Sequence, residues 1–205
     1  TQKRSWTFAD FMSEARLLSD SLIVESQQRV YLSTENTENL LKSMLALWMR
    51  GAVAVPLNQQ IPEKQKMEML QQIGCTFSFT ELLHKFKSHP TPENSLQPDS
   101  VRNSNAVATM ELNSINPKDW ATIIFTSGST GSPKAVVHSL ANHFYNALGA
   151  NERMPLNPGD RWLLSLPMYH VSGLAILFRT LLSGAAMVIP AKNVSLSKTL
   201  LNRCV

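Results

Sequence analysis

A run of hydroxyl side chains, two glycines and a lysine is the part of this sequence whose residue types could do chemistry. The run lies in residues 125–139, FTSGSTGSPKAVVHS, directly after an apolar stretch. Hydroxyl groups can hydrogen-bond phosphate oxygens, glycines let backbone N–H groups come close to a ligand, and lysine supplies a positive charge. The residues with these properties are Thr126, Ser127, Gly128, Ser129, Thr130, Gly131 and Lys134. The segment therefore predicts a site for the phosphates of a nucleotide.

The spacing of the glycines and the lysine excludes one common kind of phosphate loop. A GxxxxGK[ST] loop has four residues between its glycines and a lysine directly after the second glycine. Here two residues separate Gly128 from Gly131, and Lys134 lies three positions further on. A polar turn without a ligand is the alternative for any short Ser/Gly run. The hydroxyl residues, the glycines and the lysine follow one another in an order that favours phosphate binding over a polar turn without a ligand.

A second segment, residues 161–173, carries a histidine in a turn between two apolar stretches. Its sequence, RWLLSLPMYHVSG, predicts a strand, a turn containing Pro167, Tyr169 and His170, and the start of an apolar helix. An imidazole can donate a hydrogen bond in either protonation state, so His170 could orient a carboxylate or stabilise charge on a phosphate. Taken alone, the segment leaves open a structural histidine bonded to a backbone carbonyl.

The two segments resemble motifs of the adenylate-forming acyl-CoA synthetases. Residues 125–134 match the family signature [YF]TSG[ST]TGxPKG as far as its lysine, and Ala135 stands where most members carry glycine. The resemblance implies that the loop closes over the β and γ phosphates of ATP, with Mg²⁺ held through these phosphates. A carboxylate then attacks the α phosphate, and the acyl group passes to a thiol, usually that of coenzyme A. The resemblance also places His170, with Ser172 and Gly173 after it, beside the acid substrate.

Within the family, the wording LLSLPMYHVSGLAILFR is most similar to the o-succinylbenzoate:CoA ligases of menaquinone synthesis. Such an acid has a second carboxylate, which needs a cationic or strongly hydrogen-bond-donating partner. Arg179 is the one permanent charge between Arg161 and Lys192, so we predict that it binds this carboxylate. The alternative is a solvated arginine on the outer face of a helix. Ligases for fatty, aromatic or amino acids, a non-catalytic nucleotide-binding module and a protein-interaction domain stay open as other functions.

Composition and charge favour a globular enzyme over several other classes. The chain has 205 residues, of which 43% are hydrophobic and 17% charged, enough to bury a core. Its longest uncharged run, residues 162–178, contains Pro167 and Gly173 and is a poor membrane span. The net charge of +4 is not gathered into basic runs, which argues against nucleic acid. Cysteine and histidine spacings predict no protein-bound metal, a cytoplasmic location is expected, and the oligomeric state has no signature.

Helices and strands alternate along the chain, which predicts an α/β fold of parallel-rich sheets with flanking helices. Helices are expected at 7–22, 36–50, 62–73, 139–153 and 172–182, with a capping box between Thr7 and Asp10. Strands are expected at 30–32, 52–57, 75–79, 121–126, 162–166 and 185–189, and a surface linker at 88–105. The resemblance implies that residues 1–205 form an incomplete, by itself inactive, part of the large N-terminal adenylation domain. The adenine and ribose contacts and a small C-terminal domain would then lie outside this sequence.

Overall fold

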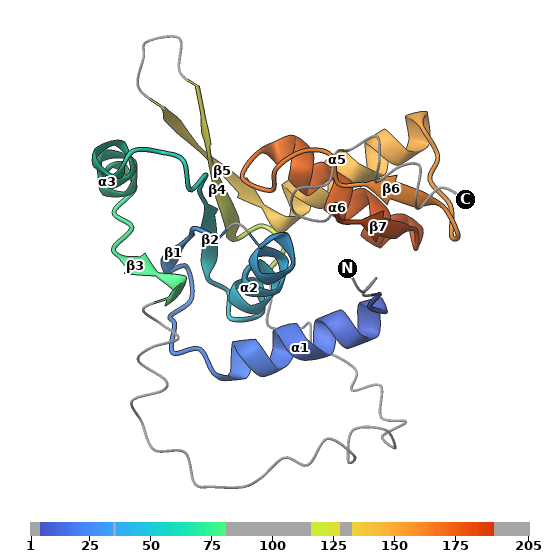
Figure 1. Cartoon of the computed structure of the whole chain (residues 1–205), viewed down its shortest axis with the longest axis horizontal. Helices are drawn as coiled ribbons and strands as arrows, with labels where there is room; N and C mark the ends of the chain where they lie inside the picture. The colour runs from blue at the N-terminus through green and yellow to red at the C-terminus, as the bar shows by residue number, and fades with distance from the viewer. Residues whose placement is uncertain (1–4, 35, 81–115, 128–132, 191–205) are drawn as a thin grey trace, which may run out of the picture.

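A parallel-rich sheet forms the centre of the molecule (Figure 1). The computed structural model describes residues 5–34, 36–80, 116–127 and 133–190. Within these ranges the sheet has the order β3-β1-β2-β4-β5. Its strands are β1 (Arg29–Leu32), β2 (Val53–Pro56), β3 (Phe77–Ser78), β4 (Trp120–Thr126) and β5 (Lys134–Ser139). The first four run parallel and β5 runs antiparallel to β4, so the predicted fold class is confirmed.

Different helices cover the two faces of this sheet. On one face, α2 (Thr37–Met49) packs in a core that includes Ala54 of β2 and Ile124 of β4. On the other face, α3 (Glu63–Gln72) places Met69 and Leu70 against Val53, Val55 and Ile123. Successive side chains of a strand point to opposite faces of the sheet. Because helices cover both faces, all four residues of β2 are buried. Burying each large side chain contributes roughly 1.5–3 kcal/mol to stability.

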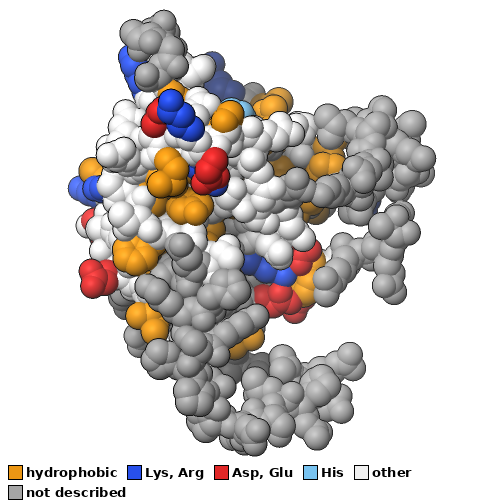
Figure 2. All heavy atoms as spheres, turned by 60° about the vertical axis from the view of Figure 1, so that its left-hand side comes forward, with side chains coloured by type: hydrophobic (Ala, Val, Ile, Leu, Met, Phe, Trp, Pro, Cys, Tyr) orange, Lys and Arg blue, Asp and Glu red, His pale blue; other side chains and the backbone are white. Residues whose placement is uncertain are grey.

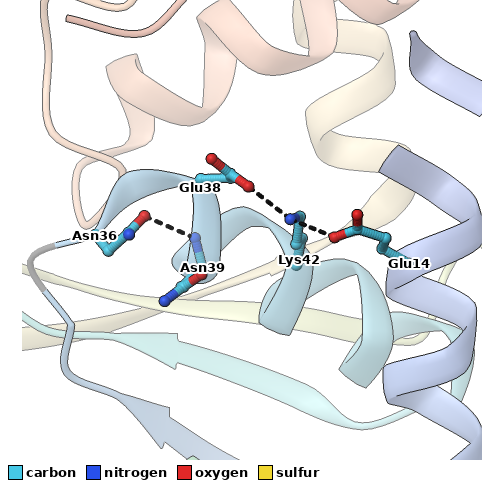
Figure 3. Close-up of polar contacts among 5 residues, drawn as sticks. All are labelled: Glu14, Asn36, Glu38, Asn39 and Lys42. Carbon is cyan, nitrogen blue, oxygen red and sulfur yellow. Dashed lines mark hydrogen bonds and ion pairs between the residues drawn. The ribbon is translucent and has the colours of Figure 1, made fainter. Parts of the chain in front are cut away.

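Helix α1 (Phe8–Asp20) is joined to α2 through one lysine (Figure 3). The Nζ atom of Lys42 lies 2.5 Å from Glu14 Oε2 and 2.6 Å from Glu38 Oε1. Burial acts to lower the pKa of Lys42, but the two carboxylates more than offset it and the pKa is raised. Lys42 therefore stays charged at neutral pH and bridges Glu14 of α1 to Glu38 of α2, beside the apolar packing of the two helices. The predicted capping box between Thr7 and Asp10 is present at the start of α1.

A second group of elements follows β5 along the chain. It consists of α5 (Leu140–Arg153), β6 (Arg161–Leu163), α6 (Val171–Ser183) and β7 (Ala186–Val188). Strands β6 and β7 pair in parallel. Helix α6 places Leu174 and Leu177 in the same core as Trp48 and Ile124, so this group shares the interior of the larger sheet. Gly184, with φ 68°, ends α6 in the left-handed conformation that favours glycine.

The structure differs from the sequence predictions at β5, which was not predicted. Most side chains of β5 are exposed or half-buried, so its residues lack the alternation that marks a strand packed on a core. The strand forms because it pairs with β4, in a hairpin that extends beyond the neighbouring strands (Figure 1). The predicted linker at 88–105 lies outside the described residues.

Charged side chains of both signs are scattered over the face of the molecule that Figure 2 shows. No basic stripe of the kind that follows a nucleic-acid backbone is visible on the described part of that face. Among the helices that the structure describes, none is both long and apolar enough to cross a membrane.

Candidate functional site

The β4–β5 hairpin carries the described ends of the predicted phosphate loop. Strand β4 ends at Thr126, strand β5 begins at Lys134, and these two residues are register partners across the hairpin. The hydroxyl of Thr126 donates to the carbonyl oxygen of Lys134 at 3.4 Å. The side chains of Thr126, Ser127 and Lys134 are exposed. The other predicted phosphate-binding residues, Gly128, Ser129, Thr130 and Gly131, lie outside the described residues.

The hairpin pairing brings a hydroxyl and an ammonium group to the base of the loop. Residues directly opposite each other in an antiparallel pair present their side chains on the same face, with Cβ atoms about 5 Å apart. Thr126 and Lys134 therefore share one side of the hairpin. An anion bound there could accept from the hydroxyl and meet the positive charge of the lysine. The structure thus brings together the two ends of a segment that the sequence predicted as one site.

His170 lies at the start of α6, where it is the N-cap residue. Its backbone is extended, with φ −113° and ψ 146°, and its side chain does not cap the helix. The imidazole is exposed, and its centroid lies 4.7 Å from that of the Tyr169 ring. A structural histidine would need a hydrogen-bond partner, and among the described residues the ring of His170 has none. The ring is therefore free to meet a ligand.

The residues around His170 combine apolar and polar character. Leu166 and Val171, both 44% exposed, flank the turn, and Ser172 is exposed beside them. Gly173 is buried against the backbone of Pro167. Neither the Tyr169 contact nor the packing of Gly173 was predicted from the sequence. A glycine in the first turn of an otherwise apolar helix was the available signal, because helices disfavour glycine unless packing requires it.

Arg179 lies apart from His170. It follows nine residues later in α6, about 13 Å along the helix axis. Its Nε donates to Asn151 Oδ1 and its Nη2 to the carbonyl oxygen of Met154, both at 2.7 Å, and its guanidinium lies 4.2 Å from the centre of the Trp162 ring. The side chain is 7% exposed, so the alternative of a solvated arginine is wrong. That Arg179 binds a substrate carboxylate stays a prediction, and the structure adds that it joins α6 to the end of α5.

A buried histidine in α5, His143, contacts both β4, which precedes the phosphate segment, and α6, which follows the His170 turn. His143 of α5 has its Nε2 3.3 Å from Thr122 Oγ1 of β4, and its ring stacks on Phe178 of α6 at 4.9 Å. The ring of His138 of β5 lies 5.2 Å away. Burial, with a smaller contribution from His138, lowers the pKa of His143 to about 4, so it is neutral at physiological pH. This cluster was not predicted from the sequence, although the spacing of His143 and Ala147 on the buried face of α5 could have indicated it.

Metal-ligating side chains do not gather in the part of the chain that the structure describes. No group of three or more His, Cys, Asp or Glu residues there could hold a metal ion. The thiol of Cys75 is buried and free, and burial raises its pKa. The described residues of the two motif segments offer hydroxyl, ammonium and imidazole groups.

Comparison with known proteins agrees with these observations. The family described as AMP-binding enzyme matches residues 1–205. The chain is 30% identical over 196 residues to a 2-succinylbenzoate–CoA ligase of Bacillus pumilus, covering 93% of this chain and 40% of the relative. It is 34% identical over 163 residues to the 2-succinylbenzoate–CoA ligase of Escherichia coli K12, covering 80% of this chain and 34% of the relative.

A solved structure shows the same fold. It is o-succinylbenzoate coenzyme A synthetase from Bacillus subtilis in complex with ATP and magnesium ion, with a TM-score of 0.73 and 21% identity. The match covers 98% of this chain and 55% of that chain. The present chain thus spans about two fifths of the length of the curated relatives it matches.

Proposed function

Because the chain belongs to the AMP-binding enzyme family, we propose that it is part of a ligase that activates a carboxylic acid with ATP. In the first step a carboxylate oxygen attacks the α phosphorus, the bond to the β phosphate breaks, and pyrophosphate leaves. The product is an acyl adenylate. In the second step the thiol of coenzyme A attacks the acyl carbon, and AMP leaves with the bonding electrons. The acid is o-succinylbenzoate, the substrate class in the names of the relatives from Bacillus and Escherichia, and the product is a precursor of menaquinone.

One observation carries this proposal: two segments of complementary chemistry each follow the carboxyl end of a parallel strand, and Thr126, Ser127, Lys134 and His170 within them are exposed. The phosphate segment follows β4, and the His170 turn follows β6. Open α/β sheets bind ligands beyond the carboxyl ends of their strands. One segment supplies hydroxyls and a cation for phosphates, and the other supplies an imidazole for the reacting groups.

The phosphate segment holds the leaving pyrophosphate. Ser127 donates a hydrogen bond, and Thr126 donates another when its hydroxyl exchanges the carbonyl oxygen of Lys134 for a phosphate oxygen. Lys134 places its charge where negative charge develops on the leaving group. Gly128, Ser129, Thr130 and Gly131 complete the loop. Mg²⁺ travels with the phosphates, since the described residues offer no cluster of carboxylates for it.

The His170 turn receives the acid. The imidazole donates a hydrogen bond to the attacking carboxylate or to the α phosphate, so that one oxygen faces the phosphorus. Leu166 and Val171 give the apolar ring of the acid a surface, with Ser172 and Gly173 next to them. The sequence assigns the second carboxylate to Arg179. We place the reaction in the cytoplasm, where a free buried thiol such as that of Cys75 stays reduced.

The test is a screen of carboxylic acids for ATP-dependent pyrophosphate release by the full-length protein. We expect release to depend on the acid, to be fastest with o-succinylbenzoate, and to yield a thioester once coenzyme A is added. A fatty, aromatic or amino acid that outperforms o-succinylbenzoate would replace the substrate but keep the reaction class. ATP binding without acid-dependent release from any acid would instead indicate a nucleotide-binding module.

A further inference from the structure

The turn that carries His170 lies directly on the first turn of α6, at Gly173. A Cβ atom on Gly173 would lie 2.2 Å from the carbonyl oxygen of Pro167, 2.6 Å from its carbonyl carbon and 2.9 Å from the carbonyl oxygen of Leu166. All three are backbone atoms, so rotation of a side chain cannot relieve the overlap. Any larger residue at 173 must therefore displace the turn or the helix.

Two backbone hydrogen bonds tie His170 to the same contact. The N–H of His170 donates to the carbonyl oxygen of Pro167 at 3.1 Å, and the N–H of Gly173 donates to the carbonyl oxygen of His170 at 3.1 Å. The atom that a methyl group at 173 would strike first is thus the acceptor that holds His170. A shift at Pro167 is passed to His170 through one bond.

The part of the chain that can move lies between two buried residues, one in the turn and one in the helix. Met168, 2% exposed, holds the turn in the core, and Leu174, 0% exposed, holds the helix. Between them His170, Val171 and Ser172 are exposed. A displacement at Gly173 is therefore taken up where the imidazole is attached.

We propose that Gly173 is a positioning residue, which fixes the place of the His170 imidazole by allowing the Pro167 turn to rest on α6. The inference rests on the proposed role of His170 in acid activation. Gly173 acts through backbone contact and needs no contact with substrate.

The chain offers a matched control for this proposal. Gly149 also lies inside a helix, α5, but a Cβ atom built there meets nothing within 4 Å. Gly149→Ala adds the same methyl group without a clash. It should leave the turnover number unchanged.

The first experiment is a double-mutant cycle in the full-length protein. Acid-dependent pyrophosphate release is measured for Gly173→Ala, His170→Ala, the double variant and Gly149→Ala. We expect Gly173→Ala to lower kcat on the order of 10²-fold, because a misplacement of about 1 Å at a reacting centre has that effect. The KM for ATP should stay within about twofold of the wild type, and the double variant should be no slower than His170→Ala within about twofold.

The second experiment observes the ring itself. The NMR chemical shifts of the His170 imidazole depend on its position relative to the Tyr169 ring, because the two ring centroids lie 4.7 Å apart. They should shift in Gly173→Ala and stay unchanged in Gly149→Ala. Should Gly173→Ala not fold, Pro167→Gly approaches the same contact from the other side by freeing the φ angle of the turn, and the same shift of the His170 signals is expected.

Three results separate the possibilities. Unshifted His170 signals with wild-type kcat in Gly173→Ala, or in Pro167→Gly if that variant is used, overturn the positioning role. A double variant that is far slower than His170→Ala also overturns it, because Gly173 would then act by a route other than His170. Wild-type activity of His170→Ala would remove His170 from the proposed function, while the NMR signals would still decide whether Gly173 places the ring.

Discussion

The two segments that carry the proposed chemistry are built in different ways. The described ends of the phosphate segment are exposed, and one side-chain hydrogen bond of 3.4 Å, from Thr126, crosses the neck of its hairpin. The His170 turn instead packs so closely on α6 that no Cβ atom fits at Gly173. Many donors can share the oxygens of a triphosphate, so none needs exact placement, whereas one imidazole beside one reacting atom must be fixed. The difference indicates that the phosphate segment depends on charge and that the His170 turn depends on close packing.

The strongest test of this comparison removes the charge of Lys134 from the phosphate segment. Lys134→Ala should lower kcat/KM for ATP on the order of 10²-fold, because the positive charge beside the leaving phosphates is lost. Its melting temperature should not change, since the side chain is exposed on β5. Steady-state kinetics and a thermal melt check both expectations. Lys118→Ala, which removes an exposed lysine two residues before the start of β4, is the control.

Arg179 tests the packed side of the comparison. Arg179→Ala leaves the carbonyl of Met154 and the amide of Asn151 without their donor and removes the stack on Trp162. We expect the free energy of unfolding to fall by about 3 kcal/mol. Chemical denaturation measures this, and an unchanged denaturation midpoint would contradict the structural role. The KM for the acid, measured on the folded variant, decides the sequence prediction that Arg179 also binds the second carboxylate.

The lowered pKa of His143 predicts that the stability of the core between the two segments depends on pH. The pKa of His143 is about 4 in the folded protein, against 6.5 when unfolded, so the unfolded chain binds its proton more readily. The stability that a neutral His143 contributes is therefore complete above pH 6.5 and is lost as the pH falls towards 4. At about pH 5 the loss should be about 2 kcal/mol. Urea denaturation of wild type and His143→Phe at several pH values isolates this contribution, and identical pH profiles would exclude it.

The smallest effect is expected from a change at Thr126, where β4 and β5 meet at the base of the loop. Thr126→Val keeps a β-branched residue in β4 and removes the hydroxyl that donates to Lys134. The KM for ATP should rise about fivefold, the equivalent of one hydrogen bond, with kcat nearly unchanged. A loss as large as that of Lys134→Ala would mean that the phosphate segment, too, depends on close placement.

The helices could be predicted because their ends depend on neighbouring residues. Thr7 and Asp10 form the predicted capping box, and Asn36 caps α2. Gly51, with φ 68°, follows the end of α2 as predicted. Such signals reside in local hydrogen bonds and in the conformational freedom of glycine, and both are visible in the sequence.

The parts that escaped prediction depend on tertiary contacts. Strand β5 exists through its pairing with β4 rather than through an apolar face of its own. The burial of Arg179 follows from the packing of α6 against α5, and the sequence shows a charge but not the face that meets a neighbour. The residue types of the site were predicted from the two motifs. The contact between Gly173 and Pro167 was not, because it depends on how a turn folds back onto a helix.

The central claim is that the segment from Thr126 to Lys134 holds the triphosphate of ATP, and chemical protection of Lys134 tests it most directly. The full-length protein is treated with an amine-modifying reagent with and without saturating ATP and Mg²⁺, and mass spectrometry follows Lys134 and Lys118, both exposed. We predict that ATP slows modification of Lys134 severalfold and leaves that of Lys118 unchanged. Equal rates at Lys134 with and without ATP would contradict the account.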